Sequence, residues 1–198
     1  MRTRATQVII SMRPAGWVCS IIHLLLVCFA VLMLSCAGPP RPTGTIQDAV
    51  KAGDVEQVRL HLKWMEPQDR GGDGWRALQL AASRGNLELV ELMIDRGIPL
   101  DKTSRRVSQP LHYAACKGHT DVMELLISRG ARVDARDGYD KTPLHWAAEC
   151  GQPEAAKLLL EHGAEVNADS KFGTPAHAAA ANRHLDVYDL LLLHGGRE

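Results

Sequence analysis

The sequence predicts an all-α repeat solenoid, in which short helix pairs stack side by side and share one continuous core. The first observation behind this prediction is a block with paired alanines that recurs at intervals of 33, 33 and 32 residues. A second block, rich in leucine, valine and isoleucine, follows each copy, and one such unit cannot bury its own apolar face. The second observation is an aromatic content of only 5%, which fits helices packed through alanine and leucine.

Residues 1–35 are expected to be an export signal rather than part of the fold. A basic head precedes a nearly continuous apolar run at 17–34, and small residues follow it. This segment resembles the signal of bacterial lipoproteins, which implies that Cys36 is acylated and begins the mature protein. An uncleaved signal anchor is the alternative, because about 18 apolar residues just span a bilayer core. A short-lived cytoplasmic product is a third interpretation.

Residues 36–44 are rich in proline and glycine and are expected to form an extended tether. A lipid on Cys36 and a signal anchor would both hold the chain at a membrane. The sequence therefore predicts a protein of the bacterial cell envelope that faces the periplasm or the exterior.

The repeats divide the rest of the chain into five predicted units. These are an N-terminal capping repeat at 45–70, full repeats at 71–103, 104–136 and 137–169, and a C-terminal repeat at 170–198. The third full repeat carries Thr-Pro-Leu-His-Trp-Ala-Ala at 142–148. These residues resemble the signature of the ankyrin repeat, and the match extends over 46–195. The resemblance implies helix-turn-helix pairs with projecting β-turn fingers and a role in protein binding.

Proline, threonine and glycine predict where the helices begin and end. A proline suits the first turn of each first helix, threonine caps it, and glycine ends it. In the last unit Arg183 replaces that glycine, and Asn182 before it predicts a turn shifted by one residue. The Gly-rich stretch 66–74 matches the repeat poorly, so the entry to the first full repeat is the least defined connection.

Two cysteines lie in the repeats, Cys116 and Cys150. An even pair in an oxidising compartment suggests a disulfide. The register argues against it, because the pair occupies neighbouring positions on adjacent repeats, and a disulfide needs Cα atoms within about 7 Å. We therefore expect two free thiols near the binding surface.

The nine histidines do not predict a metal site, because they are distributed about one per repeat and roughly 10 Å apart. The resemblance implies instead that the signature histidines, His112, His145 and His177, bond to the neighbouring finger. No phosphate loop, nucleophile elbow or zinc-binding motif occurs in the sequence. The sequence therefore predicts no enzyme and no cofactor.

The ankyrin resemblance implies that a partner binds in the groove formed by the fingers and the first helices. Although the formal net charge is zero, basic side chains are in excess among the positions that this register places there. Aromatic and arginine side chains are typical interface anchors. The predicted partner-binding residues are Trp75, Arg84, Arg105, Arg106, Lys117, Arg136, Tyr139, Lys141, Lys171 and Phe172. Alternatively, the lysines and arginines only keep the fingers soluble.

The predicted function is a membrane-tethered scaffold or binder whose protein partner has an acidic surface. The alternative is an inhibitor, such as an immunity protein that neutralises a periplasmic toxin or enzyme. Nucleic acid is a poor partner for an exported chain, and the protein is expected to be a monomer.

Overall fold

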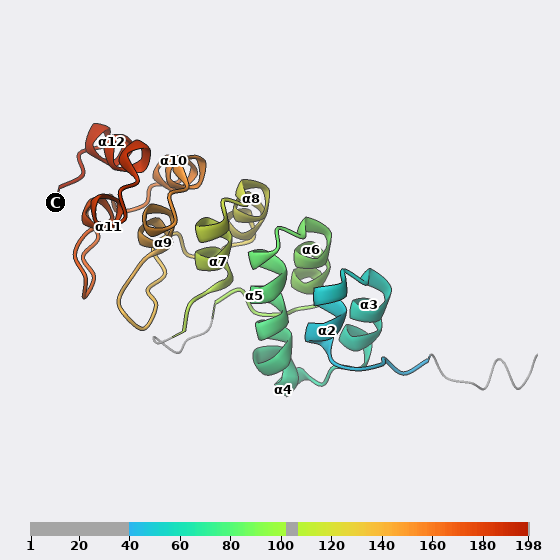
Figure 1. Ribbon diagram of the computed structural model, residues 1–198. Coiled ribbons are helices and arrows are strands. Elements are labelled where there is room, and N and C mark those ends of the chain that lie inside the picture. Colours follow the sequence, from blue (N-terminus) through green and yellow to red (C-terminus); the bar gives the residue numbers. More distant parts are fainter. Residues whose placement is uncertain (1–39, 102–106, 198) are drawn as a thin grey trace, which may run out of the picture. The chain divides into compact units, whose positions relative to one another are not determined.

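The computed structural model describes residues 40–101 and 107–197, and helices dominate the described part (Figure 1). The residues after position 40 form one compact unit. Five helix pairs follow one another: α2 (Ile46–Ala52) with α3 (Val55–Trp64), α5 (Trp75–Ser83) with α6 (Leu87–Asp95), α7 (Pro110–Lys117) with α8 (Thr120–Ser128), α9 (Pro143–Glu149) with α10 (Pro153–Glu161), and α11 (Pro175–Ala181) with α12 (Leu185–Leu193). The predicted all-helical repeat solenoid is confirmed.

The helix pairs stack in sequence order. Each first helix contacts the next first helix, from α2 through α5, α7 and α9 to α11, and the second helices form a parallel row (Figure 1). Paired alanines such as Ala114 and Ala115 on α7, and Ala147 and Ala148 on α9, are fully buried between neighbouring first helices. Leucines and methionines from the second helices complete one continuous hydrophobic core.

The first helices begin as the sequence predicts. Pro143 and Pro175 occupy the first turns of α9 and α11, and Thr142 and Thr174 cap them. The Thr174 hydroxyl accepts a hydrogen bond from the amide of His177 at 3.2 Å. Thr142 is buried and forms a capping box with His145, so this helix start also belongs to the core.

Two fingers project between the later helix pairs, over 131–142 and 164–174 (Figure 1). The first turns back through Asp140, which has a φ of 62°, and the amide of Asp137 donates to the carbonyl of Lys141 at 3.0 Å. The second closes with an isolated bridge between Ser170 and Gly173. Each finger thus leads from one second helix to the next first helix.

The entry to α5 differs from the other repeats. A short helix, α4 (Pro67–Asp69), a π-helical turn, η1 (Arg70–Gly74), and α5 follow one another without a break. No finger precedes α5, which explains why the stretch 66–74 matches the repeat pattern poorly. Gln47 on α2 donates to the carbonyl of Asp73 at 3.4 Å and ties this turn to the first unit.

The turn after α11 does not shift, contrary to the prediction. Arg183 itself takes the left-handed conformation, with φ of 63°, whereas Asn182 keeps φ of −94°. The amide of Arg183 donates to Ala180 at 3.0 Å, and the amide of His184 donates to Ala179 at 3.0 Å. The hydrogen-bond pattern of the repeat therefore sets the turn and imposes the strained conformation on arginine.

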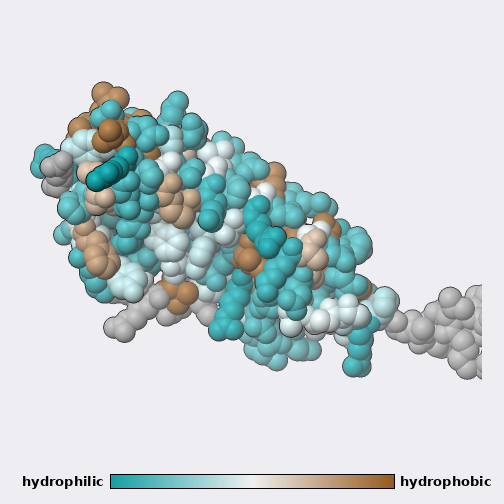
Figure 2. Space-filling model, in the orientation of Figure 1, coloured by the Kyte–Doolittle hydropathy of each residue, from teal (hydrophilic) through white to brown (hydrophobic). Residues whose placement is uncertain are grey.

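The predicted export signal and Cys36 lie outside the described residues. Within 40–101 and 107–197 no helix is long and apolar enough to cross a membrane. The face shown in Figure 2 is mostly hydrophilic, and apolar residues gather over α12. The exposed leucines of that helix are Leu185, Leu192 and Leu193.

Candidate functional site

Two of the three signature histidines hold the fingers in place, whereas His177 is exposed. His112 Nε2 lies 3.1 Å from the carbonyl of Lys141, and His145 Nε2 lies 3.0 Å from the carbonyl of Gly173. The Nδ1 atom of His145 accepts a hydrogen bond from the amide of Thr142 at 3.0 Å. Burial lowers the pKa of both His112 and His145 below the usual 6.5, so the neutral ring is favoured. These rings are therefore structural hydrogen-bonding groups.

A buried carboxylate organises the first finger. Asp137 is only 3% exposed, and its Oδ1 accepts hydrogen bonds from the amides of Tyr139 at 2.8 Å and Lys141 at 3.0 Å. Its Oδ2 accepts a 3.0 Å hydrogen bond from the indole of Trp146 on α9. The carboxylate thus fixes the finger backbone and joins the finger to the helix that follows it.

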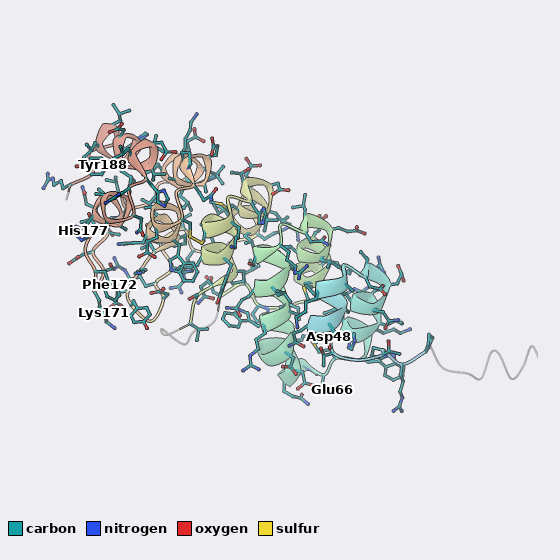
Figure 3. The ribbon with its side chains drawn as sticks, in the orientation of Figure 1. Asp48, Glu66, Lys171, Phe172, His177 and Tyr188 are labelled. Atoms are coloured by element: carbon teal, nitrogen blue, oxygen red, sulfur yellow. A yellow bond between two sulfur atoms is a disulfide. The ribbon has the colours of Figure 1, made fainter. Side chains whose placement is uncertain are left out.

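The two finger tips present an exposed aromatic pair. Tyr139 and Phe172 are each 57% exposed, and their ring centroids lie 5.5 Å apart. The amide of Lys171 donates to the carbonyl of Tyr139 at 3.1 Å, and its ammonium group donates to the carbonyl of Gly138 at 2.9 Å. Figure 3 labels Lys171 and Phe172 near the tip of the finger before α11. These bonds hold the aromatic pair in one arrangement.

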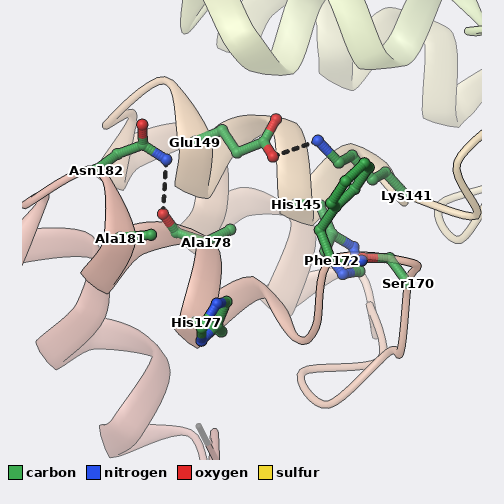
Figure 4. Close-up of a pocket in the computed structure, with 9 residues that line it drawn as sticks. All are labelled: Lys141, His145, Glu149, Ser170, Phe172, His177, Ala178, Ala181 and Asn182. Atoms are coloured by element: carbon green, nitrogen blue, oxygen red, sulfur yellow. Dashed lines mark hydrogen bonds and ion pairs between the residues drawn. The ribbon is translucent and has the colours of Figure 1, made fainter.

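A hollow lies beside each finger tip, and each has a volume of about 430 Å³. The α7–α9 hollow is lined by Ser108, Cys116, Asp137, Gly138, Tyr139, Lys141, Trp146, Glu149 and Cys150. The α9–α11 hollow is lined by Lys141, His145, Glu149, Ser170, Phe172, His177, Ala178, Ala181 and Asn182 (Figure 4).

An ion pair between Lys141 and Glu149 contributes to the lining of both hollows. The side chains are 15% and 30% exposed, and the ammonium group also lies 4.7 Å from the ring centroid of Phe172 (Figure 4). The predicted cation Lys141 is therefore neutralised by a neighbouring carboxylate and contributes no net positive charge to the groove.

Cys116 and Cys150 form a disulfide, so the expectation of two free thiols was wrong. Their Cα atoms lie 5.2 Å apart, within the range that a disulfide requires. The buried alanine pairs of α7 and α9 let the two backbones approach closely, and the repeat register underestimated this approach. The disulfide lies on the groove side and lines the α7–α9 hollow (Figure 3).

Family comparison agrees with this geometry. The family model for ankyrin repeats, in three copies, matches residues 46–137 and 134–197. The chain belongs to the ankyrin-repeat family. Ankyrin repeats indicate a protein–protein interaction module, and proteins of this kind are typically binding modules without enzymatic activity. No curated protein matches the chain in sequence.

Several predicted partner-binding residues of this ankyrin-repeat protein do lie together. Tyr139, Lys141, Lys171 and Phe172 cluster at the two finger tips, and their contacts join one finger to the next. Arg136 lies at the base of the first finger, where it donates to the carbonyl of Asp169 at 2.6 Å and pairs with Glu165 at 3.5 Å.

The remaining predicted partner-binding residues are not part of this cluster. Arg84 and Lys117 are exposed at the ends of α5 and α7, away from the finger tips. Trp75 is only 2% exposed, so its assignment to the binding surface was wrong: the continuous helix from α4 to α5 places it in the core. Arg105 and Arg106 lie outside the described residues.

The sequence analysis did not identify Trp146 as part of the site, nor the ion pair between Glu149 and Lys141. Trp146 occupies the variable position of the Thr-Pro-Leu-His-Trp-Ala-Ala signature, and a large aromatic residue there was the available signal. Among the described residues, no three histidine, cysteine or acidic side chains lie close enough to hold a metal ion.

Proposed function

We propose that this chain is a membrane-tethered ankyrin-repeat binder of the bacterial cell envelope, whose protein partner docks across the finger tips and first helices. The observation that carries this proposal is the exposed pair of Tyr139 and Phe172, 5.5 Å apart on two tied fingers. Rigid, exposed aromatic side chains lose little conformational freedom when a partner covers them, and they commonly dominate binding energy.

Uncompensated cations support a partner with an acidic surface. Arg136 and Lys141 are paired with carboxylates, whereas Arg84, Lys117 and Lys171 have no ion pair within the described residues. Within the described residues, the Arg84 guanidinium donates to the carbonyl of Lys51 at 3.1 Å and pairs with no carboxylate. Complementary charges of this kind raise association rates and suppress wrong partners.

The envelope location is supported by two independent features. The sequence offers Cys36 for acylation, and the disulfide between Cys116 and Cys150 suits an oxidising compartment such as the periplasm. A single lipidated chain with an open groove is also compatible with a monomer.

The test is a cross-linking pull-down from envelope fractions with the tagged full-length chain and a Cys36→Ser variant. We expect one stoichiometric protein partner, and incorporation of labelled fatty acid by the wild type but not by the variant. Absence of the label from the wild type would contradict a lipid on Cys36, and the absence of any specific partner would contradict the proposed binding function. If the captured partner is an enzyme or toxin that the purified chain inhibits, the inhibitor role replaces the scaffold.

Charge reversal tests the acidic partner separately. The double variant Arg84→Glu/Lys117→Glu is expected to weaken binding of the captured partner by at least tenfold at low salt. Lys63→Glu is the matched control, because Lys63 is exposed on α3 and outside the groove. An equal effect of the two changes would contradict an acidic surface at the groove.

A further inference from the structure

The two hollows beside the finger tips occupy equivalent places in consecutive repeats. Tyr139 and Phe172 stand at their rims 33 positions apart, and Trp146 and Ala178 line their helix sides 32 positions apart. The α7–α9 hollow is therefore followed, one repeat along the groove, by the α9–α11 hollow. A ligand that fills both must carry suitable side chains at the spacing of one repeat.

The spacing of the two hollows favours one backbone conformation of the bound segment. Neighbouring packed helices lie about 8–10 Å apart. A polyproline II segment rises about 3.1 Å per residue with three residues per turn, so every third side chain returns to the same face after about 9 Å. An extended β-strand alternates faces every residue, so side chains three apart point to opposite sides. Polyproline II thus matches two equivalent hollows in register.

The walls of the hollows also fit an uncharged, proline-rich occupant. Tyr139, Trp146 and Phe172 supply aromatic surface, and aromatic-lined grooves are a recurring way to bind polyproline II. The Asp137 carboxylate is only 3% exposed and already accepts from two amides and an indole, and Lys141 pairs with Glu149. The described residues that line the two hollows therefore present little accessible net charge to a ligand.

Polar groups at the rims of the hollows can bind the backbone and the flanking residues of such a segment. A polyproline II backbone leaves its carbonyl oxygens unpaired, and the Tyr139 hydroxyl has no hydrogen-bond partner within the described residues. Lys117 follows Cys116 of the α7–α9 hollow, and Lys171 precedes Phe172 of the next. Neither lysine has an ion pair in the part of the chain that the structure describes, so acidic residues beside the proline-rich segment would complement them.

We propose that the two hollows bind a proline-rich segment of the partner in the polyproline II conformation, with apolar side chains three residues apart and acidic residues at its flanks. This inference rests on the proposed binding function and specifies the chemistry of the bound segment.

Isothermal titration calorimetry of the full-length chain in detergent with synthetic peptides tests the proposal. The probe is a proline peptide with two leucines three residues apart and glutamates at both ends. A second proline peptide has the leucines four residues apart, and a helical alanine-based peptide has them seven apart. The first peptide is expected to bind at least tenfold more tightly than the other two. Equal affinities, or tightest binding of the helical peptide, would overturn the proposal.

Variants locate the binding on the protein. Tyr139→Ala and Phe172→Ala should each lower the affinity for the first peptide by about tenfold. Both side chains are exposed enough for their loss to leave the fold intact. Trp64→Ala is the control, because it removes an aromatic side chain that is 45% exposed on α3. If no peptide binds while Tyr139→Ala still abolishes capture of the intact partner, this inference fails and the proposed binding function stands.

Discussion

The carboxylate of Asp137 accepts a 3.0 Å hydrogen bond from the indole of Trp146 while only 3% exposed, and this contact couples a finger to the helix that follows it. The same carboxylate receives the amides of Tyr139 and Lys141. The exposed tip at Tyr139 therefore depends on a buried charge, which links the stability of the repeat to the shape of its binding surface.

Removing that carboxylate should lower both the stability of the repeat and its affinity for the partner. Asp137→Ala leaves the indole and two amides without their partner, so we expect the free energy of unfolding to fall by about 1–3 kcal/mol. Partner binding should weaken in parallel, because the finger loses its anchor. Urea denaturation measures the first effect, with Asp169→Ala, an exposed carboxylate of the next finger, as the control. Equal unfolding free energies for the two variants would contradict this role.

The disulfide should contribute substantially to stability. Cys116 and Cys150 are 34 residues apart, and closing a loop of this length restricts the unfolded chain by about 3–4 kcal/mol. We expect Cys116→Ser/Cys150→Ser to lower the urea midpoint, and the reduced wild type to behave like this variant. Mass spectrometry of a non-reducing digest should show the two peptides joined. Two freely alkylated cysteines in the native, unreduced protein would contradict the bond.

The buried histidines predict acid sensitivity. Burial lowers the pKa of His112 and His145 in the folded state, so below about pH 6.5 the unfolded chain binds protons that the folded chain does not. The free energy of unfolding should therefore decrease as the pH falls below 6.5, by up to about 1.4 kcal/mol per pH unit for each ring. Above this pH the two rings should add no pH dependence to the free energy of unfolding.

Urea titrations at pH 7.5 and 5.5 measure this loss. His177→Gln, which removes an exposed histidine at the same signature position, should retain it. Identical stability of the wild type at the two pH values would show that the buried rings protonate without cost.

The left-handed turns should respond in opposite directions to substitution. Arg183→Gly relieves a φ of 63°, and this gain is partly offset by the conformational entropy that glycine loses on folding. The free energy of unfolding should therefore rise by roughly 0.5–1 kcal/mol. Gly118→Ala places a side chain at a φ of 69° in the equivalent turn after α7 and should lower it by about 1 kcal/mol or more. Thermal denaturation of the two variants provides the comparison, and a destabilised Arg183→Gly would contradict the strain at this turn.

The repeat fold could be predicted because its signals are local. First helices are specified by proline in the first turn, threonine before it and paired alanines within the helix. These signals act over a few residues, so each repeat that carries them separately predicts the same structure. Trp75 shows where this reasoning fails: its position in the register predicts a finger, but the chain from 67 to 83 is helical and buries the ring. Here tertiary packing, and not the repeat register, determines where the ring lies.

The binding surface could be predicted only in outline. The register correctly brought Tyr139 and Phe172 to adjacent finger tips, but it carried no information on side-chain pairing. Lys141 therefore appeared as a free cation, although Glu149 neutralises it. The disulfide was missed for a related reason, because the spacing of helix axes does not give the distance between two backbones that pack through alanine.

If a protein partner covers the finger tips, a photo-crosslinker placed at one tip should capture it. A photoreactive phenylalanine analogue would replace Phe172 in the full-length chain, or Trp64 as another exposed aromatic control, in the cells that produce the protein. We expect one adduct of discrete mass from position 172 and none from position 64. An adduct from position 64 alone, or none from either position while the partner is still captured, would place the binding surface elsewhere.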